Sequence, residues 1–248
     1  MSASDRFLRL GGSRNFRHMG GYLAADCRLT RADRLFRSGW FDLDSKNEAE
    51  RFASLGITQV FDLRTDEERD RQPVRVDSSS TRLIALPITS GSMGAYLDSV
   101  SQLEPSEIDC KSAMVRMYRE MPAQGESSLR QLFGELAAGD AGALIICATG
   151  KDRTGLASAL LLTALGVAKD DVLGDYMISA EVYRGHEEEF ARRHNYEQRT
   201  GHDLRLFRDV FTVHPEYLEA VSEGALEALS SRLVTEPVRR QLLERFIQ

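Results

Sequence analysis

The chain has 248 residues, of which 42% are hydrophobic and 28% are charged, and its net charge at pH 7 is -6. This composition is ordinary for a globular protein with a buried core, and the acidic balance argues against a general nucleic-acid binder, which needs a basic surface. Three scattered cysteines form neither a disulfide framework nor a zinc motif. We therefore expect a single domain over residues 1–248 that is cytoplasmic and needs no metal or cofactor.

The first third of the chain is expected to alternate loops, short strands and helices. Its glycine-rich stretch at 11–22 has the composition of a loop, and runs of β-branched and apolar residues favour strands. The predicted elements are a loop at 11–22, strands at 35–37, 57–63 and 82–88, a helix at 47–55 and a helical turn at 66–71.

The rest of the chain is mostly helical in pattern around one continuous apolar run, which is typical of a strand buried on both faces. Because strands alternate with helices, we predict an α/β fold with a central, largely parallel sheet flanked by helices. The longest apolar stretch, at 156–168, is too short to span a bilayer, so we expect no integral membrane segment. The predicted elements are a strand at 143–146 and helices at 106–121, 126–138, 154–167, 169–182, 214–231 and 236–247, with a charged helical stretch at 183–210.

The loop between the strand at 143–146 and the next helix has the properties of an anion site. Ligands of open α/β sheets bind beyond the carboxyl ends of the strands, and this loop lies there. A helix amino terminus carries unpaired N–H groups, and successive backbone amides in a turn can surround an anion. We therefore predict a phosphate site made by Ala148, Thr149, Gly150, Lys151 and Thr154.

Two side chains of this loop add chemistry to the anion site. Cys147 and Arg153 are six positions apart, so a loop that curls around one anion brings both to it. The guanidinium can hold two phosphate oxygens at once, and the site favours a thiolate. A thiolate behind a bound phosphate is placed for in-line attack, which would form a phosphocysteine. Asp152 is the nearest acid that could protonate the leaving group.

Three further residues have predicted roles around the same loop. The Thr154 hydroxyl could donate to the sulfur, and Lys151 would add a positive charge at the rim. Asp62 ends a strand and is an alternative acid, although holding Arg64 or loop amides is the commoner role for an Asp at such a position.

The loop Cys-Ala-Thr-Gly-Lys-Asp-Arg-Thr-Gly at 147–155 resembles the active-site loop of cysteine-based protein tyrosine phosphatases. This version is similar to the atypical bacterial tyrosine phosphatase B type, which includes dual-specificity and phosphoinositide phosphatases. Further segments resemble the same family in the same order, at 15–21, 37–39, 56–68 and 214–218.

The resemblance implies a tyrosine-phosphatase-like fold with a helical lid, for which 183–210 is the candidate. It makes Cys147 the nucleophile, Arg153 the phosphate clamp and Asp152 the general acid. It associates Lys151 with substrates that carry additional phosphate. The implied activity is hydrolysis of phosphomonoesters of proteins, on tyrosine or with dual specificity, or of phosphoinositides, and no oligomeric state is implied.

Two positions depart from the family pattern. Ile146 stands where the family usually has histidine before the nucleophile, and His18 stands where it has aspartate. The first departure motivates an alternative, a non-catalytic phosphate-binding pseudophosphatase, although the presence of both Cys147 and Arg153 argues against it. An arsenate reductase or sulfurtransferase is a third hypothesis, which the segments at 15–21 and 37–39 disfavour.

Overall fold

The computed structural model of the chain describes residues 4–248 except 14, 25–26, 90, 187–188, 190–191, 193–195 and 222–224. Its centre is a five-stranded sheet in the order β1-β2-β5-β3-β4. Strands β2, β5, β3 and β4 run parallel, and only β1 pairs antiparallel, at the edge. The strands are β1 (Arg17–His18), β2 (Leu35–Ser38), β3 (Ile57–Asp62), β4 (Arg82–Ala85) and β5 (Gly142–Ile146).

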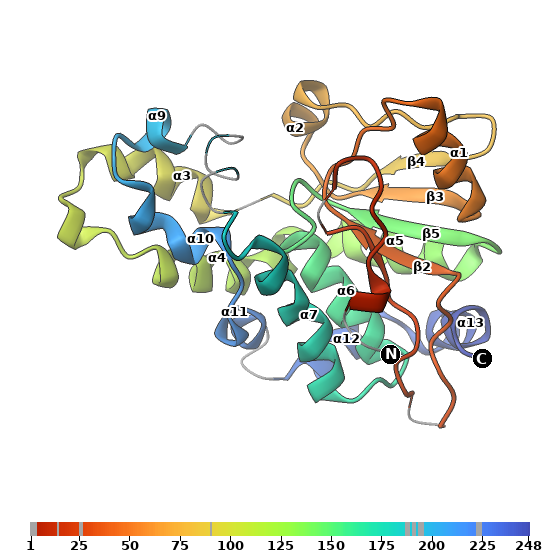
Figure 1. The fold of residues 1–248 in the computed structure, drawn as a ribbon. Helices are drawn as coiled ribbons and strands as arrows, with labels where there is room; N and C mark the ends of the chain where they lie inside the picture. Colours follow the sequence, from red (N-terminus) through yellow and green to blue (C-terminus); the bar gives the residue numbers. More distant parts are fainter. Residues whose placement is uncertain are drawn as a thin grey trace.

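Helices cover both faces of the sheet, and a further group of helices extends beyond its carboxyl edge (Figure 1). Helix α2 lies at that edge, and α3, α4 and α9 to α11 form the extension, in which α4 packs against α3, α10 and α11. The helices are α1 (Lys46–Ser54), α2 (Asp66–Arg71), α3 (Ser92–Ser99), α4 (Cys110–Gln124), α5 (Glu126–Ala138), α6 (Arg153–Ala164), α7 (Lys169–Tyr183), α9 (Tyr196–Thr200), α10 (Arg208–Phe211), α11 (Pro215–Ala220), α12 (Leu226–Leu233) and α13 (Glu236–Phe246), with 3-10 turns at Ser4–Arg6, Val100–Gln102, Pro105–Glu107 and Leu204–Phe207.

The core consists of two apolar clusters that strand β5 separates. Alternate side chains of a strand point to opposite faces, and β5 follows this rule. Ile145 and Cys147 belong to the larger cluster, with the helices α4 to α7, whereas Leu144 and Ile146 belong to the smaller one. Ile146 is fully buried there. The residue that departs from the family pattern therefore points to the opposite face of the sheet from the cysteine.

Most predicted elements are confirmed, and the differences have local causes. The predicted loop at 11–22 contains the two-residue strand β1, which pairs with β2. The helix predicted from 106 begins at Cys110, because the Asp109 side chain accepts a hydrogen bond from the Ser112 amide and caps it there. The strand predicted at 82–88 ends at Ala85, and the helix predicted at 214–231 is two helices, α11 and α12.

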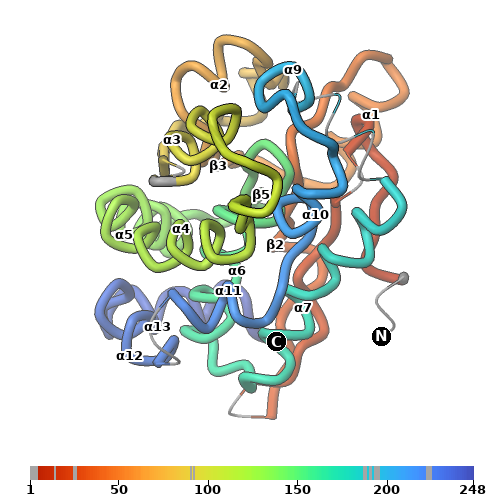
Figure 2. The backbone as a smooth tube through the Cα atoms, turned by 90° about the vertical axis from the view of Figure 1, so that its left-hand side faces the viewer, coloured from red at the N-terminus to blue at the C-terminus, as the bar shows by residue number. Residues whose placement is uncertain are grey.

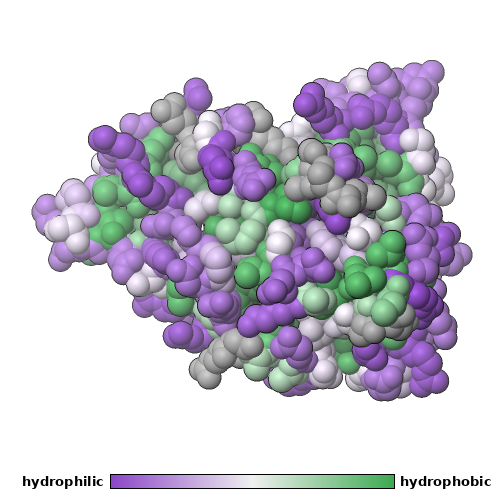
Figure 3. Space-filling model, turned by 60° about the horizontal axis from the view of Figure 1, so that its bottom comes forward, coloured by the Kyte–Doolittle hydropathy of each residue, from purple (hydrophilic) through white to green (hydrophobic). Residues whose placement is uncertain are grey.

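One helix was not predicted, and one predicted helical stretch is described only in part. Helix α3 was not predicted, and it lies against α4 and α9 (Figure 2). The charged stretch at 183–210 lies partly outside the described residues, and its described part holds α9, a 3-10 turn and α10. None of the described helices is both long and apolar enough to cross a membrane. The face drawn in Figure 3 is mostly hydrophilic, with apolar side chains gathered near its centre.

Candidate active site

The loop from Cys147 to Asp152 joins β5 to α6 at the carboxyl edge of the sheet, where sequence analysis placed it. Its carbonyl groups are bonded to the protein behind it. The Ala148 carbonyl accepts from the Trp40 amide at 3.0 Å, and the Thr149 carbonyl accepts from the Tyr183 hydroxyl at 2.6 Å. The Gly150 carbonyl accepts from the side chains of Asn15, at 2.9 Å, and Arg37, at 2.8 Å. Because the carbonyls face outward, the peptide planes can turn amides toward the inside of the loop.

Gly150 is required for this conformation. Its φ is +71°, in the left-handed region that glycine favours, and a Cβ there would lie 2.4 Å from the Gly39 nitrogen and the Ser38 carbonyl carbon. Its amide donates to the Cys147 sulfur at 3.2 Å. The glycine thus lets the loop pack against the end of β2. It also directs its own amide at the sulfur, where a thiolate would accept the hydrogen bond.

Arg153 is the first residue of α6 and is held by a residue that sequence analysis did not single out. Its Nη1 and Nη2 atoms donate to the two carboxylate oxygens of Glu68, each at 2.6 Å. Within the described residues, Nε and the outer hydrogen of Nη2 have no protein acceptor, so that edge of the guanidinium can bind two phosphate oxygens. Glu68 therefore fixes one edge of the Arg153 guanidinium, and another edge is available to a ligand.

The charges of this pair stabilise each other. Burial raises the pKa of Glu68, but the hydrogen bonds and charge of Arg153 outweigh it and lower that pKa to about 2. Burial lowers the pKa of Arg153, whereas the bonds from Glu68, with the charge of Cys147, raise it above its ordinary value. The pair is therefore fully ionised at neutral pH. Glu68 itself is held in a capping box with Thr65 at the start of α2.

Asp152 and Lys151 are bound to each other. Lys151 Nζ donates to both carboxylate oxygens of Asp152 at 2.8 Å. The Tyr118 hydroxyl, from α4, donates to Oδ1 of the same carboxylate, also at 2.8 Å. The prediction that Lys151 lies at the rim was wrong: its side chain is 2% exposed and is turned to the adjacent carboxylate of Asp152.

A buried ion cluster lies behind the loop, and sequence analysis did not predict it. Asp175, on α7, accepts from Arg37 Nη1 at 2.5 Å and from the Tyr22 hydroxyl at 3.1 Å, and its carbonyl accepts from Arg17 at 2.8 Å. All three charged side chains are 0–1% exposed. Burial raises the pKa of Asp175, but Arg17 and Arg37 lower it to about 2. Arg37 also bonds the Gly150 carbonyl, so the cluster supports the loop directly.

The structure also decides the expectations for Asp62, Thr154 and the arginines of the first strands. Asp62 does not face the loop as an alternative acid, because it forms a two-pronged ion pair with buried Arg64 and is itself fully buried. The Thr154 hydroxyl, predicted to donate to the sulfur, is buried and has no hydrogen-bond partner within the described structure. Arg17 and Arg37 are fully buried behind the loop, where Arg37 bonds the Gly150 carbonyl and Arg17 bonds Asn15.

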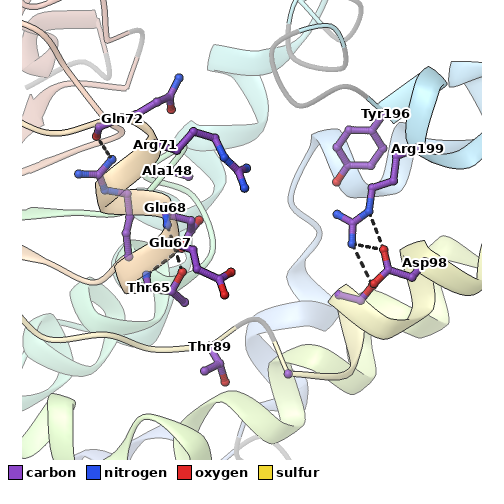
Figure 4. Close-up of a pocket in the computed structure, with 13 residues that line it drawn as sticks. Thr65, Glu67, Glu68, Arg71, Gln72, Thr89, Asp98, Ala148, Tyr196 and Arg199 are labelled. Carbon is purple, nitrogen blue, oxygen red and sulfur yellow. Dashed lines mark hydrogen bonds and ion pairs between the residues drawn. The ribbon is translucent and has the colours of Figure 1, made fainter.

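A cleft of about 750 Å³ opens next to the loop and touches it at Ala148. One side of the cleft is α2, with Thr65, Glu67, Glu68 and Arg71 (Figure 4). We call the facing side the α3–α9 wall, which consists of Gly91, Gly94, Asp98, Tyr196 and Arg199. Arg199 closes this wall by donating to Asp98 at 2.5 and 2.9 Å. The cleft therefore combines exposed charges of both signs with the loop from Cys147 to Asp152 at one end.

The site residues that sequence reasoning missed share a property. Glu68, Tyr118 and Asp175 act through long-range contacts that sequence reasoning did not predict, although Glu68 lies in the family-like segment 56–68. The Asn15 and Arg37 segments had a sequence signal, since both resembled family elements, but their contact with Gly150 was not predicted.

The chain matches a known protein family over most of its length. Residues 8–231 match the model described as the tyrosine phosphatase family. A Cupriavidus necator relative, whose tyrosine-protein phosphatase name is provisional, is 34% identical over 167 residues, which cover 66% of this chain and 60% of that protein. The triple specificity protein phosphatase PtpB of Mycobacterium tuberculosis is 29% identical over 257 residues, which cover 90% of each chain.

A comparison with solved structures gives a looser likeness. The crystal structure of TpbA from P. aeruginosa in complex with pTyr aligns over 95% of this chain and 94% of its own. The identity is 13% and the TM-score is 0.38, so this superposition adds nothing to the site assignment.

Proposed function

Because the chain belongs to the tyrosine phosphatase family, we propose that it hydrolyses phosphomonoesters through a phosphocysteine intermediate. The observation that carries the proposal is the loop itself, in which the Gly150 amide lies 3.2 Å from the Cys147 sulfur while the carbonyls face outward. Arg153 presents a free guanidinium edge at the end of the same loop. A thiolate, a set of amides and a bidentate cation are what attack on a bound phosphate requires.

In the first step the Cys147 thiolate forms an S–P bond while the bond from phosphorus to the leaving oxygen breaks. The leaving oxygen takes the electron pair and a proton from Asp152. In the second step water attacks phosphorus, Asp152 takes a proton from that water, and the S–P bond breaks to restore the thiolate. Loop amides and Arg153 stabilise the charge on the equatorial oxygens in both steps.

We propose a phosphotyrosine substrate on a protein as the primary one. Dual specificity and phosphoinositide activity are proposed extensions, in line with the name of the Mycobacterium tuberculosis relative. Charges of both signs in the cleft, Glu67 and Arg71 on α2, suit a peptide that carries both signs. We also propose that residues 1–248 are a single cytoplasmic domain, and that 183–210 form a lid, because Tyr196 and Arg199 line the cleft.

The test is release of phosphate from p-nitrophenyl phosphate by the wild type and by Cys147→Ser, with and without a chelator. We expect chelator-resistant turnover in the wild type and none in the variant. Cys110→Ser is the matched control, because that thiol is buried away from the loop and burial raises its pKa to about 12. It should keep wild-type turnover.

A different result would select the alternative function. If the wild type binds vanadate but does not turn over, the pseudophosphatase hypothesis replaces the enzyme. The location of Ile146 on the opposite face of the sheet argues against that outcome, because its side chain does not approach the sulfur.

A further inference from the structure

The general acid of the proposed reaction is enclosed by tyrosines from several helices. The Tyr118 hydroxyl donates to Asp152 Oδ1, and the Tyr176 hydroxyl donates in turn to the Tyr118 oxygen, each at 2.8 Å. Both tyrosines are fully buried. Three sequence-distant elements, α4, α7 and the loop, thus form one chain of hydroxyl groups that ends on the carboxylate.

Packing fixes the position of the Tyr118 hydroxyl. Its ring meets the Tyr176 ring edge to face at 6.2 Å between centroids and the Tyr217 ring at 5.4 Å. The Tyr176 ring also packs on Gly155, where a Cβ would lie 3.0 Å from it. Burial, followed by the charge of Asp152, raises the pKa of Tyr118 well above its ordinary value, so its hydroxyl keeps its proton at every working pH.

We propose that Tyr118 is a positioning residue for Asp152: its hydroxyl donates to Oδ1 and, together with Lys151, which donates to both oxygens, fixes the orientation in which the carboxyl group meets the leaving group. This role rests on the proposed function, because it requires Asp152 to act as the acid. The hydroxyl also stabilises the carboxylate that forms when the proton leaves, together with Lys151. Tyr118 therefore sets both the direction and the strength of the acid without touching the substrate.

The pH dependence of the proposed reaction depends on every charged or titratable group that faces Asp152. Lys151 is bound to it, and the charge of Asp152 contributes to the raised pKa values of Arg153 and of the surrounding tyrosines. Removing the Tyr118 hydroxyl breaks its bond to Asp152 and also takes the acceptor from the Tyr176 hydroxyl, so Tyr176→Phe is measured beside it to separate the two bonds. The tyrosines are Tyr118 on α4, Tyr176 on α7, Tyr196 on α9 and Tyr217 on α11.

Tyr118→Phe keeps the ring and removes the hydroxyl. We expect kcat/KM for phenyl phosphate, which has a poor leaving group, to fall about 10-fold, and that for p-nitrophenyl phosphate to fall by no more than about 2-fold. The basic limb of the pH profile of kcat/KM should move upward by about one unit, since the carboxylate loses a hydrogen bond that favours its charged form. Tyr176→Phe should change the ratio between the two substrates and the basic limb of the pH profile in the same directions as Tyr118→Phe, by smaller amounts.

Tyr217→Phe is the matched control. It lies in the same cluster, but its hydroxyl donates to the Asp209 carbonyl at 3.0 Å and does not bond the acid. We expect an unchanged pH limb and an unchanged ratio between the two substrates. Circular dichroism of each variant checks the fold, and in an Asp152→Asn background the Tyr118 substitution should have no further effect on the ratio.

Two results would overturn the role of Tyr118. If Tyr118→Phe lowered kcat/KM equally for both substrates and left the basic limb of the pH profile unchanged, Tyr118 would contribute packing alone. A full additional loss in the Asp152→Asn background would show that it does not act through Asp152. Failure of the proposed function is distinguishable, because then the wild type itself would show no Cys147-dependent turnover of p-nitrophenyl phosphate, and an acid-positioning role would be excluded with it.

Discussion

The phosphate loop and the α3–α9 wall face the same cleft but are held in opposite ways. Behind the loop, Arg17, Arg37 and Asp175 are at most 1% exposed and bonded to one another. On the wall, Arg199 and Asp98 form an ion pair whose side chains are 41% and 68% exposed. Breaking a buried pair costs about 3–5 kcal/mol, whereas an exposed pair contributes less than about 1 kcal/mol. The loop is thus supported by buried ion pairs, whereas the α3–α9 wall is held by an exposed one and is more easily adjusted.

The largest effect that this contrast predicts is on Asp175. Asp175→Asn leaves two buried arginines without their carboxylate, so we expect the free energy of unfolding to fall by about 3–5 kcal/mol. Urea denaturation measures it. Glu181→Gln is the matched control, an exposed acid on the same helix, and should change stability by less than about 0.5 kcal/mol. A similar change in the free energy of unfolding for both variants would refute the idea that this ion cluster supports the loop.

The same residue makes stability depend on pH. The pKa of Asp175 is lowered to about 2 in the folded protein, against about 3.9 in an unfolded chain. Its contribution is therefore complete above about pH 5 and is lost as pH falls through 4 toward 2. In Asp175→Asn, the acid-induced loss of stability over that range should become shallower than in the wild type.

An intermediate effect is expected at Glu68, which aims the phosphate clamp. Glu68→Gln keeps the shape but offers one amide N–H to a guanidinium that needs acceptors, so Arg153 should lose its fixed direction. We expect kcat/KM for p-nitrophenyl phosphate to fall about 10- to 100-fold with little change in the fold. Asp70→Asn, an exposed acid on the same helix, is the control and should retain activity. Equal activity of the two variants would show that Arg153 is positioned without Glu68.

Local sequence signals predicted the part of the site that one loop contains. Cys147, Arg153 and Gly150 share a single strand–loop–helix segment, so their spacing is visible in the sequence, while the positive φ of Gly150 came only from the structure. Glu68 and Tyr118 were not predictable, because each meets the loop only after distant elements pack. Lys151 was misplaced for a related reason: its pattern gives a charge on the loop, while its burial follows only from the folded structure, where it pairs with Asp152.

The smallest effect is expected on the α3–α9 wall, and it tests the other half of the contrast. Asp98→Asn removes one charge of an exposed ion pair, so stability should change by less than about 1 kcal/mol, and kcat for p-nitrophenyl phosphate should not change. The KM for phosphotyrosine peptides should change by about 2- to 3-fold, with the sign set by the charge of the flanking residues, since Arg199 becomes free to pair with a substrate. Added salt should weaken the difference between wild type and variant, because exposed charges are screened. A loss of kcat as large as that of Glu68→Gln would mean that the wall is coupled to the reacting groups and is not an independent, adjustable surface.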